Sequence, residues 1–406
     1  MTKVIKTGVV YLLFLLYIYS IKFTFIPVTG KLIIAVLGLI LWCIDAMRGK
    51  TMLKRHTINI FVIAAILLAW NFFVVLMNGT GQFLYVSYFV SLASAFFASY
   101  FIVRYSGKQI KSAEKLWNIL AITVFFESLI TIGLRFVPSL QDFLFSIQEF
   151  QTKDSSDQDL LNLYRFVGLG EAVYFGVLPS CSIGSLSIMA LLIKNEKTSY
   201  SFFLWAMFLV INIVSFLIAR YSLIVPVICI VWYVYHNFSE DKFTKIVKFC
   251  ILGVLVLFGS FVFLKSFLPE GMFAWAFELL EEGTSSSTED VSDWLINTHF
   301  DFGTFVFGDG LYTIGEGYYK SIDIGIYRQI FFSGIIGLGL LIFLHYIILK
   351  SSRQCYPSIV MKEYVLFSMI AYLFTQIKGD MPFFDLFMLV YVFLEYSPII
   401  RKQYYG

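Results

Sequence analysis

The sequence predicts an all-α polytopic membrane protein with about 12 transmembrane helices. Of its 406 residues, 59% are hydrophobic and only 14% are charged, and the mean hydropathy is +0.80. This composition excludes a soluble globular protein. Apolar windows of roughly 20 residues, the length that crosses a bilayer, recur along the whole chain. We interpret as spans residues 7–26, 31–47, 57–77, 85–103, 116–136, 171–193, 201–218, 222–236, 247–267, 329–350, 363–378 and 384–398.

The predicted elements differ in character along the chain. The first four spans have short connections and few interior charges, so we expect them to form a scaffold. Glu127 lies in the middle of the fifth span, and a long polar loop, about 137–170, follows it. Arg220 later interrupts an apolar run, and a second polar loop covers about 268–328. We find no internal repeat and predict a single integral membrane domain, residues 1–406.

The basic residues predict the orientation of the spans, because cytoplasmic loops retain Lys and Arg close to the span ends. Alternate connections carry basic clusters when the N-terminus is placed in the cytoplasm. These clusters comprise Lys3 and Lys6; Arg48, Lys50, Lys54 and Arg55; Arg104, Lys108, Lys111 and Lys115; Lys194 and Lys197; Lys242, Lys245 and Lys248; Lys350, Arg353 and Lys362; Arg401 and Lys402. Both termini are then cytoplasmic, and both long loops face outward.

Composition also narrows the chemistry. The net charge of +3 averages two opposite faces of the protein and gives no support for nucleic-acid binding. The cysteines lie in apolar runs or in a cytoplasmic loop, so no disulfide is expected. No Cys/His spacing typical of a metal site is present, and we predict no metal and no cofactor.

The second polar loop has three predicted parts. Residues 272–282, with the sequence MFAWAFELLEE, have apolar and acidic positions at helical spacing and predict a helix at the outer membrane interface. The sequence GTSSSTED, residues 283–290, predicts a flexible polar connector. Glycine turns and aromatic residues between 294 and 328 predict a compact folded lid.

Three arginines are expected at the outer ends of spans, namely Arg165, Arg220 and Arg328. A guanidinium suits carboxylate or phosphate, and three of them could stabilise a diphosphate leaving group. Arg220 has an alternative role as an interface arginine that pairs with an acid of the loop. Arg328 has an alternative role as a membrane-edge anchor that pairs with Asp323.

Other polar residues are weaker candidates. Asp323 could accept a proton from a sugar hydroxyl, or it could cap the helix that follows. Glu127 is a candidate substrate-binding residue because a carboxyl inside a span is costly, although a hydrogen bond to a neighbouring helix would also explain it. Asp309 and Glu316 could bind sugar or only face solvent, and Tyr221 could stack on a sugar ring.

A few of these positions carry a family resemblance. Arg165 precedes Gly176 by eleven positions, Arg220 begins a span, Gly308 and Gly310 form a Gly-x-Gly turn, and a helix is expected to start at the GIIG sequence of residues 334–337. This pattern resembles the O-antigen polymerase family, membrane glycosyltransferases related to the O-antigen ligases. Ligases hold histidine where this chain has Asp323, and the difference favours a polymerase.

The resemblance implies a GT-C-type architecture and an inverting, metal-independent transfer at the periplasmic face of a bacterial inner membrane. The growing glycan on undecaprenyl diphosphate would be the donor, and a lipid-linked repeat unit would be the acceptor. By analogy, Arg165 and Arg220 would bind the diphosphate, Arg328 would assist or hold sugar, and Asp323 would orient or deprotonate the acceptor.

The resemblance also implies partners and leaves alternatives open. The expected partners are undecaprenyl-diphosphate-linked oligosaccharide repeat units, membrane lipids, a chain-length-regulating membrane protein and a repeat-unit flippase. An O-antigen ligase or a capsule or exopolysaccharide polymerase is the nearest alternative. A flippase or other transporter is the alternative from a different class, although transporters seldom need a long acidic outer loop.

Overall fold

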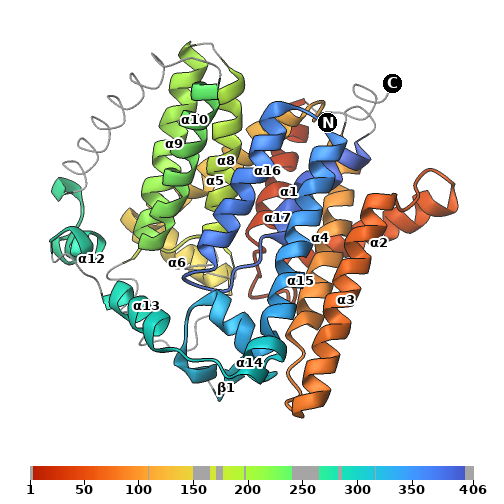
Figure 1. Cartoon of the computed structure of the whole chain (residues 1–406). Coiled ribbons are helices and arrows are strands. Elements are labelled where there is room, and N and C mark those ends of the chain that lie inside the picture. Colours follow the sequence, from red (N-terminus) through yellow and green to blue (C-terminus); the bar gives the residue numbers. More distant parts are fainter. Residues whose placement is uncertain are drawn as a thin grey trace.

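The computed structural model describes residues 3–107, 109–149, 165–170, 177–195, 198–239, 265–281, 286–315 and 317–397, and these form a helical bundle (Figure 1). Within those ranges, seven helices are long and apolar enough to cross a membrane. They cover Gly30–Met47, Arg55–Asn78, Leu84–Ser106, Ala113–Phe136, Tyr200–Ile218, Arg220–Phe238 and Gly325–Cys355. The prediction of an all-α, multi-pass membrane protein is thereby supported, and the count of twelve spans remains a prediction.

The N-terminal helices form one side of the bundle. They are α1 (Lys3–Ile18), α2 (Gly30–Met47), α3 (Arg55–Asn78) and α4 (Leu84–Ser106). Helices α2 and α4 pack closely because Gly38 has no side chain, and a Cβ at this position would overlap the Phe97 carbonyl oxygen. Helix α1 ends at Ile18, earlier than the predicted span end at residue 26. Ser20 has a left-handed backbone (φ +46°), and a bridge between Lys22 and Thr29 turns the chain back.

The central helices are α5 (Ala113–Phe136), α6 (Pro138–Ile147), α8 (Leu178–Lys194), α9 (Thr198–Ile218), the short 3-10 turn η2 (Arg220–Leu223) and α10 (Ile224–Ser239). Of the predicted span 171–193, the described part begins at residue 177, and α8 begins at Leu178. Most of the predicted span 247–267 lies outside the described residues, and only 265–267 are described, as helix.

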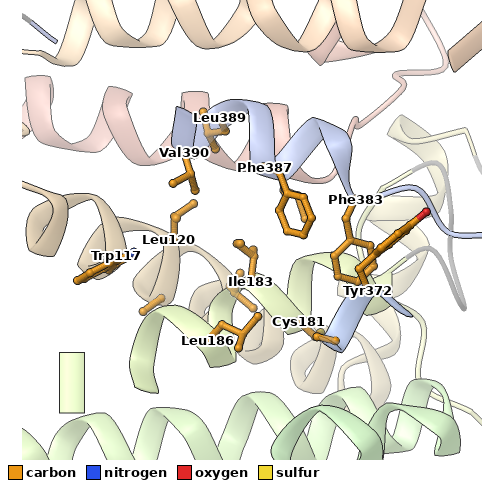
Figure 2. Close-up of a cluster of buried hydrophobic side chains, with 14 of the residues drawn as sticks. Trp117, Leu120, Cys181, Ile183, Leu186, Tyr372, Phe383, Phe387, Leu389 and Val390 are labelled. Carbon is orange, nitrogen blue, oxygen red and sulfur yellow. The ribbon is translucent and has the colours of Figure 1, made fainter. Parts of the chain in front are cut away.

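The C-terminal helices complete the core. They are α15 (Gly325–Cys355), α16 (Ile359–Thr375) and α17 (Phe384–Tyr396). Figure 2 shows Trp117 and Leu120 of α5, Ile183 of α8 and Phe387 of α17 directed into one apolar cluster. All four side chains are buried. Burial of such side chains in a shared core holds the helices in register.

The second polar loop is folded. It contains α12 (Glu270–Glu281), α13 (Ser286–Asn297), α14 (Phe302–Phe307), the hairpin strands β1 (Thr313–Ile314) and β2 (Gly317–Tyr318), and the 3-10 turn η3 (Tyr319–Ser321). Helix α12 matches the predicted helix at 272–282. The predicted connector at 283–290 is wrong from Ser286 onward, because these residues begin α13. Serine has an intermediate helix propensity, so a run of serines can begin a helix when helix-forming and apolar residues follow it.

The bundle has two chemically distinct ends. Figure 1 shows α6, α13, α14 and β1 at the lower end, which we call the loop end. At the opposite end, Arg104 pairs with Asp45, Lys194 pairs with Glu114, and the Tyr396 hydroxyl accepts the backbone N–H of Lys54. Arg104, Lys194 and Lys54 each belong to one of the predicted basic clusters, and the cytoplasmic orientation of this end remains a prediction.

Candidate functional site

Arg328 lies near the start of α15 and is only 7% exposed. Its guanidinium carbon lies 3.5 Å from the centre of the Tyr318 ring and 4.5 Å from that of Tyr312, and these two rings are nearly perpendicular to each other. Nη2 donates to the Tyr312 hydroxyl, and Nη1 lies 3.4 Å from Asp323 Oδ1. The predicted pairing with Asp323 is present, and Arg328 is buried beneath the β1–β2 hairpin.

Asp380, which the sequence analysis did not select, connects several elements at the loop end. Its Oδ2 accepts hydrogen bonds from the Tyr88 hydroxyl (2.7 Å), the Tyr312 hydroxyl (2.9 Å) and Gln329 Nε2. Gln329 in turn accepts from the Tyr85 hydroxyl (2.6 Å). Burial and the adjacent Asp380 carboxylate both raise the pKa of Tyr312, so its hydroxyl remains a donor.

Two atoms of this cluster lack a partner. Asp380 Oδ1 and Arg328 Nε are both buried, and neither has a hydrogen-bond partner in the part of the chain that the structure describes. A buried polar atom without a partner is costly, and a role in binding or catalysis is one explanation for it. The only sequence signal for Asp380 is a carboxylate in the turn KGDMP between two predicted spans.

The Gly-x-Gly turn positions this cluster through close backbone packing. Gly308 approaches the break in α15 so closely that a Cβ would lie 2.6 Å from the Gly334 nitrogen. The Asp309 N–H donates to Phe331 O (2.6 Å), and the Gly310 N–H donates to Phe332 O (3.1 Å). Gly334 breaks α15 with φ +66° and ψ −178°, so a helical segment starts directly after it, where the sequence analysis expected a helix to start. The second half of α15 begins after it.

Asp309 is held by its own loop. Its Oδ1 accepts from the Thr304 hydroxyl at 2.5 Å. The pKa of Tyr319 is raised by burial and by a hydrogen bond to Asp309. These contacts support a structural role, and sugar binding by Asp309 stays a prediction. Glu316, the other predicted sugar-binding acid of this segment, lies outside the described residues.

Asp323 is partly accessible, with its side chain 32% exposed. It does not cap α15, because Ile324 is the N-cap residue and no side chain caps this helix. Burial raises the pKa of Asp323, and the positive charges of Arg328 and Lys378 oppose that rise. A carboxyl with a raised pKa at an accessible position is better suited to accept a proton than an ordinary aspartate.

Arg220 begins the turn η2 between α9 and α10. Its Nη1 forms an ion pair with Glu278 of α12, so the alternative role predicted for it, pairing with a loop acid, is present in the structure. Tyr221 donates its hydroxyl to the Phe374 carbonyl (2.6 Å) near the end of α16. This contact ties the η2 turn to the C-terminal helices.

Arg165 belongs to a segment, residues 165–170, that Glu127 holds in place. The fully buried Glu127 carboxylate accepts from the Leu169 N–H (3.3 Å), the Thr131 hydroxyl (2.9 Å) and the Tyr19 hydroxyl (3.4 Å). Gly168 makes this possible, because a Cβ there would lie 2.9 Å from Glu127 Oε1. Glu127 therefore has a structural hydrogen-bond role, and its contact with substrate stays a prediction.

The three arginine-bearing segments are neighbours at the loop end. The Phe166 N–H, next to Arg165, donates to Leu217 O (3.1 Å) at the end of α9, just before Arg220. The Ile326 N–H, close to Arg328, donates to Gln376 O (3.1 Å), near the point where Tyr221 contacts α16. The guanidiniums have different surroundings: Arg220 pairs with Glu278, Arg328 lies between tyrosines, and Arg165 lines a small pocket with Arg135.

The fold and the site define an all-helical, multi-pass membrane protein with a polar, arginine-containing site at one end of its bundle. Among the residues that the structure describes, no group of three or more His, Cys, Asp or Glu side chains is arranged to hold a metal ion. Comparisons with protein-family models, curated proteins and solved structures found no match for this chain.

Proposed function

We propose that the protein is a bacterial inner-membrane glycan polymerase that acts on lipid-linked repeat units, most simply those of the O-antigen. The observation that carries this proposal is the placement of Arg165, Arg220 and Arg328 on neighbouring segments at one end of the bundle. These segments are far apart in the sequence, so their position at the same end of the bundle is a property of the fold. The resemblance of the arginine and glycine positions to the O-antigen polymerase family supports the same function.

The proposed reaction moves the growing glycan from undecaprenyl diphosphate to the acceptor repeat unit. The bond between the sugar C1 and the diphosphate oxygen breaks, and a bond forms between C1 and the acceptor hydroxyl oxygen from the opposite face. Undecaprenyl diphosphate leaves with the electron pair, and the guanidiniums stabilise its charge. The acceptor proton passes to Asp323 and from there to water. No cofactor takes part in this scheme.

Arg220 has a specific role in the proposal. Its partner Glu278 is a carboxylate on α12, and this carboxylate occupies a position that a phosphate oxygen of the substrate would take. Exchange of Glu278 for the diphosphate would release α12 at the moment when substrate binds. The site would face the periplasm, because the basic residues at the opposite end favour the cytoplasm. The expected partners are a repeat-unit flippase and a chain-length-regulating membrane protein.

Arg220→Ala tests the proposed function. We expect cells that carry this variant to make lipopolysaccharide with a single repeat unit, since removal of one charge-stabilising donor typically lowers such rates about 10²- to 10³-fold. The measurement is the lipopolysaccharide ladder on a gel, together with turnover of a defined lipid-linked repeat by the purified protein. An unchanged distribution of chain lengths would defeat the assignment.

Glu278→Gln is the matched control, because it breaks the same ion pair without removing the proposed phosphate ligand. It should retain long chains. Equal loss in both variants would show that Arg220 only supports the fold. Repeat units trapped on the cytoplasmic leaflet would favour a transporter instead, and intact polymerisation with unligated glycan would favour a ligase.

Lys378→Gln tests Asp323 as the proton acceptor. The positive charge of Lys378 lowers the pKa of Asp323, so its removal should raise that pKa further. An aspartate accepts a proton only when it is ionised, and activity falls as the pH drops through its pKa. The acidic limb of the pH–rate profile should therefore move to higher pH.

The pH–rate profile is measured for polymerisation by the purified protein on a defined lipid-linked repeat. Lys362→Gln, at the exposed opposite end, should leave the profile in place. An acidic limb that stays fixed in Lys378→Gln, or that persists in Asp323→Asn, would assign the proton acceptor to another group.

A further inference from the structure

Helix α14 belongs to the second polar loop, yet the surface that it exposes is apolar. Phe302 is 79% exposed, Phe305 42% and Phe307 45%. Thr304 is the only polar side chain of the helix, and it is buried against the Asp309 carboxylate. A contiguous exposed apolar patch of this kind marks an interaction surface.

The C-terminal end of α14 packs against the side of α3 and not beyond its end. The Phe307 ring stacks on the Trp70 ring of α3, with centroids 6.2 Å apart. Trp70 precedes Asn78, the last residue of α3, by eight positions, which at 1.5 Å per residue is about 12 Å along the helix axis. Leu76 lies between these two levels and is 78% exposed. Phe307 therefore lies at a level from which α3 continues to expose apolar side chains.

Helix α15 places α14 at the same level. The Val306 carbonyl oxygen packs so closely on Gly334 that a Cβ there would lie 2.1 Å from it, and Trp70 Nε1 donates to the adjacent Ser333 O at 2.8 Å. Ser333 follows Gly325, the first residue of α15, by eight positions, again about 12 Å along the axis. Helix α14 thus lies alongside α15 and α3, both long and apolar enough to cross a membrane (Figure 1).

The chain that leaves α14 has paired backbone groups, as a segment in contact with lipid requires. The Gly308 N–H donates to Thr304 O (2.9 Å), and the Asp309 N–H donates to Phe331 O (2.6 Å). Asn78 Nδ2 donates to Gly308 O at 3.2 Å. This part of the loop can therefore leave water without losing hydrogen bonds at these positions.

We propose that α14 inserts into the lipid leaflet at the loop end, where acyl chains cover its exposed face. Lipid is the occupant because this face continues the membrane-facing surface of α3. The Phe307, Trp70 and Phe73 rings follow one another, with Trp70 and Phe73 centroids 5.2 Å apart and Phe73 43% exposed. The inference is independent of the proposed function, since no substrate enters it. The Gly308 turn and the hairpin over Arg328 then extend from a helix that is anchored in the membrane.

A fluorescent amino acid at position 302 tests the insertion. Acridonylalanine replaces Phe302 in the full-length protein in phosphatidylcholine nanodiscs, and its quenching by doxyl-labelled phosphatidylcholine is compared with its quenching by iodide in the water. The label at Leu76, which is as exposed as Phe302, is the lipid control, and the label at the exposed Ser292 of α13 is the water control. We expect doxyl quenching at 302 within about twofold of that at 76, and iodide quenching about fivefold or more below that at 292.

Two results of this measurement would overturn the proposal. Iodide quenching at 302 that equals the quenching at 292 would place α14 in water. Weak quenching by both reagents would show that another protein surface, such as a second copy of this chain, covers the helix in place of lipid.

A substitution tests the same face with the label at Phe305. Phe302→Asp introduces a charge that lipid excludes, so doxyl quenching at 305 should fall about threefold or more. Phe302→Leu is the matched control and should keep that quenching, because its side chain remains apolar. Unchanged doxyl quenching of the label at Leu76 in Phe302→Asp shows that the bundle is still folded. Equal quenching at 305 in Phe302→Asp and Phe302→Leu would contradict insertion of this face.

Discussion

Gly334→Ala is expected to destabilise the protein by about 3 kcal/mol or more and to abolish activity. The backbone at Gly334 has φ +66° and ψ −178°, a conformation that essentially only glycine adopts. A Cβ at this position would also overlap the Val306 carbonyl oxygen, which belongs to the backbone of α14 and cannot rotate away. The substituted chain must therefore either straighten α15 or separate it from the Gly308 turn.

Either change moves the candidate site. The break at Gly334 sets the direction of the first half of α15, which carries Arg328 and Gln329. It also presents the Ser333 carbonyl to the Trp70 indole N–H, which donates to it at 2.8 Å. Loss of the break would leave that N–H without its acceptor and would shift Arg328 relative to Tyr312.

Gly339→Ala is the control on the same helix. A Cβ at Gly339 meets no heavy atom within 4 Å, and this residue has ordinary helical geometry. Alanine should stabilise the helix there by about 0.5 to 1 kcal/mol. Unfolding of the purified protein in mixed micelles, followed by tryptophan fluorescence, measures both variants. Equal stability of Gly334→Ala and Gly339→Ala would show that the close packing of the Gly308 turn against the break in α15 does not stabilise the protein.

Asp380→Ala is the second change with a large expected effect. It removes the acceptor shared by the partly buried Tyr88 and Tyr312 and the buried Gln329, and leaves Gln329 Nε2 with only its long contact (3.4 Å) to the Tyr88 hydroxyl. Loss of an acceptor from a buried, charged network typically costs about 3 kcal/mol. Tyr312 also receives a hydrogen bond from Arg328, so the position of the guanidinium should change with it.

The same unfolding measurement tests this prediction. Asp142→Ala removes an exposed carboxylate on α6 and should change stability by less than about 0.5 kcal/mol. Asp380→Asn keeps one carbonyl oxygen as an acceptor, and its stability should lie between those of Asp380→Ala and Asp142→Ala. A similar stability for Asp380→Ala and Asp142→Ala would contradict the role of Asp380 as the connecting acceptor.

Several features of the fold followed from local sequence. Hydropathy predicted the long apolar helices, because solvation by lipid depends on the composition of each segment and not on its neighbours. The helix at 272–282 followed from its 3.6-residue periodicity and is α12. The pairing of Arg328 with Asp323 could also be predicted from the sequence, because the two residues are only a few positions apart.

Other parts of the site could not be predicted in this way. Asp380 is separated from Tyr88 by most of the chain, and no local pattern indicates that they meet. Arg135 lies at the end of α5 beside the first long loop, and its position across a pocket from Arg165 depends on how 165–170 packs against α5. The pairing of Arg220 specifically with Glu278 likewise required the placement of α12.

The sequence by itself determined that this protein is a multi-pass helical membrane protein with two long polar loops, because the transfer of side chains between water and lipid is a local property. Only the tertiary structure decided which of those polar groups meet. Hydrogen bonds and ion pairs act over a few ångströms. The segments that carry Arg165, Arg328 and Asp380 reach one end of the bundle only when close packing at Gly168, Gly325 and Gly334 brings distant parts of the chain together.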